Sequence, residues 1–270
     1  MKTLEDHTIL YDDECPMCSK YTQAFVKTGM LDNNGRHAFT EAYACNLPHV
    51  DWNRARNEIA VINKRDNTVQ YGVDGLLDIL AYNAAWLRPL FSLKPIQFLV
   101  RRLYFFISYN RKVIAPGKIV EGRNVCTPDL NYGYRWAYIL FAWLVTSTTL
   151  VYYSMLLTPL IPQTNFIREF LICGGQIVVQ GVVILFVKKK QCVHYLGNMM
   201  TISLGGALLL TPMLFISLWV HSNIFFLMYF MAIVALMFLE HMRRVKLLEL
   251  PFFISATWVL YRLLVLLIIL

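Results

Sequence analysis

The sequence lacks the motifs on which several large enzyme classes depend. It has no glycine-rich loop of the kind that holds phosphate groups, no Gly-x-Ser-x-Gly turn for a serine nucleophile, and no Ser/His/Asp arrangement. These absences argue against nucleotide and hydrolase chemistry. Residues 1–9 carry charges but no apolar stretch, so we expect no cleavable signal peptide.

Charged residues are also scarce. They make up 16% of the 270 residues, whereas hydrophobic residues make up 57% and the mean hydropathy is +0.48. This composition is too apolar for an ordinary soluble domain, and the excess lies in the second half, so it predicts a two-part membrane protein. Five apolar segments approach the length that crosses a bilayer. They lie at 136–157, 170–187, 199–220, 224–239 and 252–270.

Basic residues predict how these segments are oriented. Lys188–Lys190 lie between the second and third segments, and further basic residues lie at 243–246, between the fourth and fifth. The other connections contain little beyond Arg168 and His221. Because cytoplasmic loops are rich in Lys and Arg, five crossings predict a multi-pass cell membrane protein with a cytoplasmic N-terminal part and a C-terminus outside. The net charge of +8 fits basic loops beside anionic lipid and needs no nucleic acid.

The pair of thiols in Cys15–Cys18 is the strongest indication of chemistry. A strand-like run at 8–11 precedes the pair, and apolar residues recur at helical spacing after it. Pro16 suits the first helical position, so we expect Cys15 to be the N-cap, where N–H groups and the helix dipole favour a thiolate. The acidic residues at 12–14 oppose this effect.

The expected reaction of this pair is thiol-disulfide exchange. Cys15 attacks a disulfide, or is itself attacked, and Cys18 resolves the mixed disulfide. This chemistry requires a Cys15 sulfur that reagents can reach. In the cytoplasm the thiol pool is reducing, so we expect a dithiol that reduces a substrate and not a structural disulfide.

A metal site is the alternative use of two cysteines. Structural zinc takes about four ligands, and the sequence has no second Cys-x-x-Cys pair and no His-x-x-x-His pair. We therefore predict no metal and no other cofactor.

Patterns after the thiol pair predict a thioredoxin-like α/β domain. The expected elements are a strand at 37–40, a short helix or loop at 48–56, a hairpin of strands at 59–62 and 68–71, and a helix at 75–82 capped by Asp74. Such a sheet presents Cys15 at its carboxyl edge, where ligands bind.

Three motifs resemble the DCC family of thiol-disulfide oxidoreductases, also known as DUF393. They are Tyr11–Cys18, Tyr71–Asp74 and Tyr109–Arg111. The resemblance covers roughly residues 7–115 and implies a thioredoxin-like fold and disulfide reductase activity, with Cys15 and Cys18 as the redox pair. Asp13 stands where the family motif has glycine. The Cys-Pro-x-Cys form is also similar to glutaredoxin, which implies glutathione as a reductant.

Asp12 is the candidate for a proton acceptor beside the pair. A carboxylate near the dithiol can take the proton of the resolving thiol. Its alternative role is to accept hydrogen bonds from amides of the turn. The expected partners are a protein or small-molecule disulfide substrate, a glutathione- or thioredoxin-type reductant, and the lipid bilayer.

These patterns divide the chain into three parts. Residues 1–115 form the thioredoxin-like domain, 116–133 a linker, and 134–270 an α-helical transmembrane bundle of about five helices. Residues 95–109 are predicted to form a helix with a broad apolar stripe. This stripe lies on the membrane surface or, in the interpretation we favour, packs against the sheet of the same domain.

A function carried by the bundle is the alternative hypothesis. The bundle would bind a lipid, a quinone or a partner, and the dithiol would be a redox sensor or a structural remnant. Hydrogen bonding between helices is the interpretation we favour for the polar residues in or near the membrane. These are Gln176, Gln180, His194, Glu240 and His241.

The remaining cysteines give weaker indications. Cys126 could relay electrons from Cys18, although a lone cysteine is more often a packing residue. Cys173 and Cys192 lie too far apart for a disulfide if one helix holds both.

Overall fold

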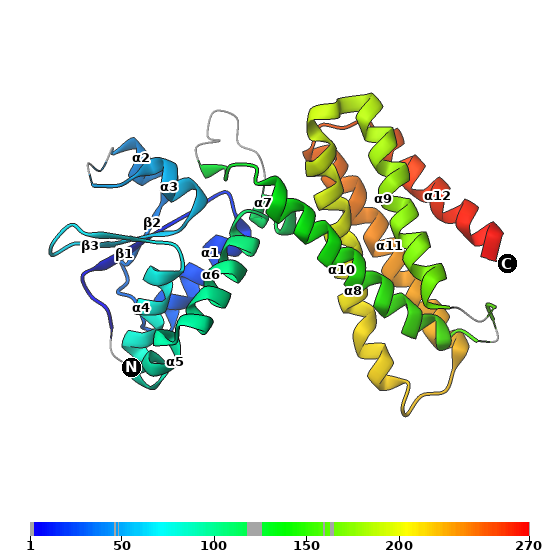
Figure 1. Ribbon diagram of the computed structural model, residues 1–270, viewed down its shortest axis with the longest axis horizontal. Helices are drawn as coiled ribbons and strands as arrows, with labels where there is room; N and C mark the ends of the chain where they lie inside the picture. Colours follow the sequence, from blue (N-terminus) through cyan, green and yellow to red (C-terminus); the bar gives the residue numbers. More distant parts are fainter. Residues whose placement is uncertain are drawn as a thin grey trace. The chain divides into compact units, whose positions relative to one another are not determined.

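The computed structural model describes residues 3–269 except 46, 48, 118–125, 159, 163 and 164. The chain forms two compact units, Met1–Tyr134 and Arg135–Leu270 (Figure 1). The first unit contains β1 (His7–Tyr11), α1 (Pro16–Lys27), β2 (Arg36–Ala38), α2 (Phe39–Ala44), α3 (Trp52–Asn57), β3 (Ala60–Asn63), β4 (Val69–Tyr71), α4 (Val73–Asn83), η1 (Ala85–Leu87), α5 (Arg88–Ser92), α6 (Lys94–Ser108) and α7 (Arg111–Ile114).

A four-stranded mixed sheet is the centre of the first unit. The strand order is β2-β1-β3-β4, in which β1 is parallel to β2 and antiparallel to β3, and β3 is antiparallel to β4. Alternate side chains of a strand point to opposite faces. Ile9 therefore packs with residues of α1, α4 and α6 on one face, and Leu10 packs with residues of α2 and α3 on the other (Figure 1). This arrangement confirms the predicted thioredoxin-like fold.

The start of α4 differs from the prediction. Asp74 is not the helix cap, because α4 begins at Val73 and Gly72 is its N-cap. Gly72 has a φ of 71°, a left-handed conformation that glycine adopts without steric cost, and a β-carbon there would collide with the Glu58 carboxylate. Asp74 lies in the first turn and pairs with Arg101 at 2.8 Å.

The helix predicted at 95–109 is present as α6, but its apolar stripe packs against the domain only in part, since Ile96, Val100 and Phe106 are half-buried. Leu99 and Leu103 are 65% and 55% exposed, so they do not pack against the sheet. The side of α6 that faces the domain carries Tyr104, which packs with the Ile9 cluster, and this side also makes polar contacts. The Tyr104 hydroxyl accepts a hydrogen bond from the Ile59 N–H at 2.7 Å, and the Ser108 hydroxyl donates to the Asn57 carbonyl at 2.6 Å.

The second unit is helical. Its elements are α8 (Tyr132–Met155, which begins in the first unit), α9 (Phe166–Lys188), η3 (Lys189–Gln191), α10 (Cys192–Ile216), α11 (Asn223–Leu247) and α12 (Phe253–Ile269). Among the described residues, three helical stretches are long and apolar enough to cross a membrane, and α12 is a shorter apolar helix. The three are Tyr132–Met155, Phe166–Ile216 and Asn223–Leu247.

The stretch Phe166–Ile216 contains two of the predicted segments. Its 51 residues would span about 76 Å as one helix, more than twice the roughly 30 Å hydrocarbon core of a bilayer. The helix breaks at Lys188, where φ is −155°. The chain then folds back, because the Tyr195 hydroxyl of α10 donates to the Gln180 side chain of α9 at 2.8 Å. In the described part of the chain, the second unit therefore contains five helices, α8 to α12, in agreement with the predicted bundle of about five.

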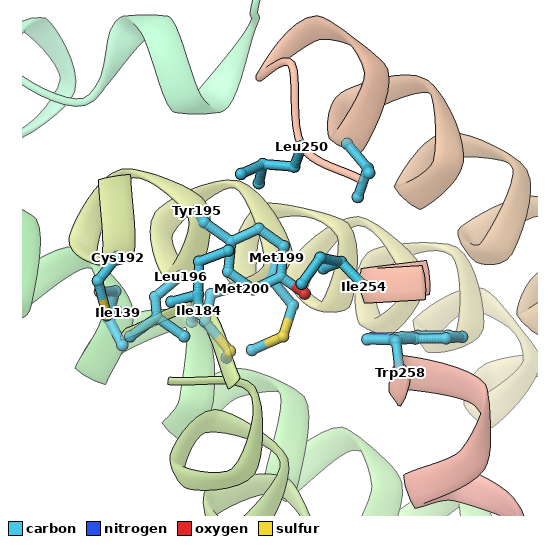
Figure 2. Packing of buried hydrophobic residues seen from close by; sticks show 12 residues of the cluster. Ile139, Ile184, Cys192, Tyr195, Leu196, Met199, Met200, Leu250, Ile254 and Trp258 are labelled. Atoms are coloured by element: carbon cyan, nitrogen blue, oxygen red, sulfur yellow. The ribbon is translucent and has the colours of Figure 1, made fainter. Parts of the chain in front are cut away.

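The core of the second unit joins all five of these helices. Figure 2 shows Tyr195 and Met199 of α10 beside Ile254 and Trp258 of α12. Ile139 of α8 and Ile184 of α9 belong to the same buried cluster. Dispersion contacts of this kind hold transmembrane helices together, because lipid is as apolar as the side chains.

Candidate active site

Cys15 and Cys18 lie at the carboxyl end of β1, as the sequence predicts. Cys15 is the N-cap of α1 and Pro16 follows at the first helical position. The Cys18 N–H donates to the Cys15 sulfur at 3.4 Å. A carboxylate oxygen of Asp12 and the two sulfurs all lie within 4.8 Å of one another. The structure thus brings together all three predicted site residues.

The two thiols have opposite acidities. A side-chain hydrogen bond from Cys18 is the main cause that lowers the pKa of Cys15 to about 7, and the Cys18 N–H contributes in the same direction against burial. The same interaction with Cys15, together with burial, raises the pKa of Cys18 far above that of an ordinary thiol. Asp12 opposes the Cys15 thiolate without reversing this result. Cys15 is therefore the thiolate near neutral pH and Cys18 the thiol.

Both sulfurs are buried, which differs from the accessible sulfur that the reaction requires. Cys15 is 0% exposed and Cys18 is 6% exposed. Gly117 lies against the loop before α1, because a β-carbon on it would collide with the Glu14 carbonyl. A large substrate therefore reaches Cys15 only after the residues that bury it move.

Arg111 is a site residue that the sequence analysis assigned no role. Its side chain is 7% exposed, and its Nε lies 3.1 Å from Oδ2 of Asp12. Its Nη2 donates to the carbonyls of Arg56 at 2.7 Å and Cys126 at 2.9 Å. The signal was present in the Tyr109–Arg111 motif, but the sequence does not show that this motif reaches the thiol pair.

Asp12 takes the structural role that was its alternative interpretation. It accepts a hydrogen bond from the Glu14 N–H at 3.1 Å and also binds the Lys112 ammonium at 3.2 Å. Together with Arg111, two cations hold the carboxylate beside the sulfurs. Its role as a proton acceptor stays a prediction.

A pocket of about 380 Å³ opens beside Cys18. Its walls are mainly apolar and aromatic, with Tyr21, Phe39 and Tyr104 among them, and Asp12 and Arg111 supply charge. Cys126 also lines this pocket, 3.7 Å from the Arg111 guanidinium. Burial raises the pKa of Cys126 to about 12, so it is a thiol at neutral pH. A relay of electrons through Cys126, the less favoured of its two interpretations, stays a hypothesis.

Comparison with protein families agrees with this geometry. Residues 9–115 match the family model for DCC1-like thiol-disulfide oxidoreductase. This match confirms the resemblance that the three motifs carried. Neither the curated proteins nor the solved structures gave a significant match.

The departure from the DCC motif at Asp13 is accommodated without backbone strain. Asp13 is not among the described residues with positive φ. Its carboxylate accepts a hydrogen bond from the Thr40 hydroxyl at 2.8 Å. The side chain therefore fastens the loop before α1 to α2, at the position where the family motif has glycine.

The chemistry of the donors does not favour a metal at the thiol pair of Cys15 and Cys18. Within the described part of the chain, Asp12, Cys15 and Cys18 are the one group of three donors close enough to share an ion. They are one short of the four that structural zinc takes. Arg111 and Lys112 already bind the carboxylate and repel a further cation.

The polar residues of the bundle divide into two groups. Tyr195 bonds both Gln180 and His241, and His241 Nδ1 lies 3.1 Å from the Ser255 hydroxyl. These contacts are the helix-to-helix hydrogen bonds that we favoured. Gln176 is 2% exposed, and its amide has no hydrogen-bond partner among the described residues.

The other two polar candidates, Glu240 and His194, have other partners. Glu240 pairs with Arg243 and Arg244 on its own helix. The His194 carbonyl accepts a hydrogen bond from the Asn198 side chain at 3.1 Å. The bundle-ligand hypothesis stays a prediction.

We expect the reduced chain to titrate one thiol near pH 7. With a pKa of about 7, Cys15 is about half ionised at pH 7 and only about one-tenth ionised at pH 6, so its ultraviolet thiolate absorbance rises between these values. Cys15→Ser should abolish this step. Cys18→Ala should move it to higher pH, because it removes the main cause of the shift. The matched control Cys45→Ser, at an exposed cysteine, should leave it in place. A step that survives Cys15→Ser would contradict the assignment.

Proposed function

We propose that this chain is a membrane-tethered thiol-disulfide oxidoreductase that reduces disulfides with Cys15 and Cys18. The observation that carries the proposal is the pair of opposite acidities, a Cys15 pKa of about 7 beside a Cys18 pKa far above the ordinary range. Disulfide exchange needs one ionised nucleophile and one thiol that acts later. The family match at residues 9–115 supports the same class of reaction.

The reaction has two steps. The Cys15 thiolate attacks one sulfur of the substrate disulfide, the substrate S–S bond breaks, and a substrate thiolate leaves. Cys18 then loses its proton and attacks the Cys15 sulfur, which forms the Cys15–Cys18 disulfide and releases the second substrate thiolate. The substrate gains two electrons and the chain loses two, so two glutathione thiols or one thioredoxin-type dithiol must restore the reduced pair.

Asp12 is the proposed acceptor for the Cys18 proton. Its carboxylate lies within 4.8 Å of both sulfurs. Arg111 and Lys112 hold it in place, so it is oriented before the reaction begins. The test of the function is to trap the mixed disulfide after the first step by removing Cys18.

We also propose that the first unit faces the cytoplasm. Within the second unit, the basic residues of two connections lie at the same end, because Arg244 near the end of α11 donates to Asn198 near the start of α10 at 3.0 Å. Lys188–Lys190 precede α10 at that end. The excess of positive charge on cytoplasmic loops then fixes the orientation.

An impermeant maleimide applied to intact cells should distinguish the two orientations. Cys45 is an exposed native thiol of the first unit, so we expect it to be labelled only after permeabilisation. A cysteine placed at His221, in the exposed connection between α10 and α11, should be labelled from outside. The opposite pattern would reverse the topology and would favour an oxidising role in place of the reducing one.

A further inference from the structure

Helix α6 carries an apolar face that the first unit does not cover. Phe98, Leu99, Leu103 and Ile107 are 63%, 65%, 55% and 39% exposed, and we call them the α6 apolar face. Leu99, Leu103 and Ile107 follow one another at intervals of four residues and so form one stripe along the helix, and Phe98 lies next to Leu99 at the edge of this stripe. In water, an uncovered face of this size is costly and marks an interaction surface.

The surroundings of the α6 apolar face are basic. The sequence contains no acidic residue between Asp78 and Glu121. Arg102 is exposed and its guanidinium lies 5.1 Å from the centre of the Phe98 ring, and the exposed Lys94 begins the helix. An amphipathic helix with aromatic and aliphatic side chains on one face and cations beside them is typical of binding to anionic lipid.

The carboxyl end of α6 is fastened to the start of a candidate membrane span. Tyr134 belongs to the first turn of α8 and stacks on Tyr109 with 5.4 Å between ring centres. Its carbonyl accepts a hydrogen bond from the Asn110 side chain at 3.0 Å, and its hydroxyl accepts one from Arg102 at 3.5 Å. Tyrosines concentrate where a span meets the membrane–water interface. The helix that carries the uncovered face is thus tied to the point where the chain enters lipid.

We propose that the α6 apolar face binds the anionic surface of the bilayer that the chain itself spans. The helix has 15 residues and is about 22 Å long, enough to lie along the interface. The first unit is then held on the membrane by two attachments, the covalent link to α8 and the inserted side chains of α6. This proposal does not depend on the reaction of the thiols.

The test uses the full chain in vesicles of phosphatidylcholine with one-third phosphatidylglycerol, in a Cys45→Ser background. An environment-sensitive fluorophore is attached to Leu99→Cys on α6 and, as the matched control, to Asn53→Cys, an exposed position on α3. A nitroxide on the lipid chains and iodide in the water serve as the two quenchers. We expect the lipid quencher to act on the Leu99 label about threefold more strongly than on the Asn53 label, and iodide to show the reverse order.

Three results would overturn the proposal. Equal quenching of both labels by iodide would mean that the α6 apolar face stays in water. Protection of the Leu99 label from both quenchers would mean that protein covers the face, whether a second copy or another chain. Two changes test the role of charge: vesicles made only of phosphatidylcholine, and the double variant Lys94→Glu with Arg102→Glu. If neither change weakens the lipid quenching of the Leu99 label, the bound surface need not be anionic.

Discussion

Cys18→Ser should convert the chain into a trap that holds a substrate covalently on Cys15. The substituted residue has no sulfur, so the second step of the exchange cannot occur and the mixed disulfide accumulates. Purified full chain with oxidised glutathione as the probe should gain one glutathione on Cys15, measured by mass spectrometry under non-reducing conditions. In cell membranes, the same variant should form a disulfide-linked complex with its native substrate, which is detected by non-reducing electrophoresis.

The comparison of Cys18→Ser with Cys18→Ala tests whether the low pKa of Cys15 speeds formation of the adduct. The serine hydroxyl still donates a hydrogen bond to the Cys15 thiolate, whereas alanine removes the main cause of its low pKa. We therefore expect the serine variant to form adduct faster than the alanine variant at pH 7. The difference in rate should shrink as the pH rises, because Cys15 then becomes ionised in both variants. Adduct that still forms in a double variant with Cys15→Ser would contradict the proposed enzyme. So would a lack of adduct in both Cys18 variants at every pH.

Access to Cys15 should limit the rate at which this adduct forms. The sulfur is 0% exposed, and Gly117 packs directly on the Glu14 carbonyl. Gly117→Ala places a β-carbon in that contact and raises the energy of the closed form by about 1–3 kcal/mol. Each 1.4 kcal/mol changes a population about tenfold, so in the Cys18→Ser background we expect roughly tenfold faster adduct formation. Gly133→Ala is the control, because its β-carbon meets its nearest neighbour at an ordinary 3.4 Å.

The sequence predicted the parts of this site that local rules decide. Pro16 and the alternation before it place a helix start and a strand end around Cys15, and both follow from backbone chemistry within a few residues. The fold class followed from the order of such elements. The five apolar segments were recognisable for the same reason, since hydropathy is a property of a short window.

The parts that the sequence did not predict depend on contacts between distant residues. Arg111 meets Asp12 across 99 positions, and Gly117 meets Glu14 across about a hundred, so no local pattern reports either contact. The apolar stripe of α6 was visible in the sequence, but periodicity alone does not say whether protein or lipid covers it. The exposure of Leu99 and Leu103 in the fold shows that the first unit leaves this part of the stripe uncovered.

Arg111→Met should lower the free energy of unfolding of the first unit by about 3–5 kcal/mol. The substitution removes one partner of a buried ion pair and leaves Asp12, 3% exposed, with Lys112 as its remaining cation. It also leaves the carbonyls of Arg56 and Cys126 without the donor that now satisfies them. Hydrogen exchange of the first unit in the full chain measures this loss.

An exposed ion pair supplies the matched control for that loss. Arg101 and Asp74 form an ion pair at 2.8 Å, but their side chains are 53% and 51% exposed. Because water screens such a pair, Arg101→Met should cost less than about 1 kcal/mol. An Arg111→Met variant that is no less stable than Arg101→Met would show that the buried cluster does not support the fold.

The acidity of Cys15 separates the electrostatic role of Arg111 from its structural role. The Arg111 charge lowers the pKa of Cys15 and the Asp12 charge raises it. Arg111→Met should therefore move the thiolate step above pH 7 and Asp12→Asn should move it below, although both substitutions destabilise the first unit. General loosening of the fold would move both variants in the same direction, toward an ordinary thiol. Shifts of opposite sign therefore require that the two charges act directly on the Cys15 sulfur.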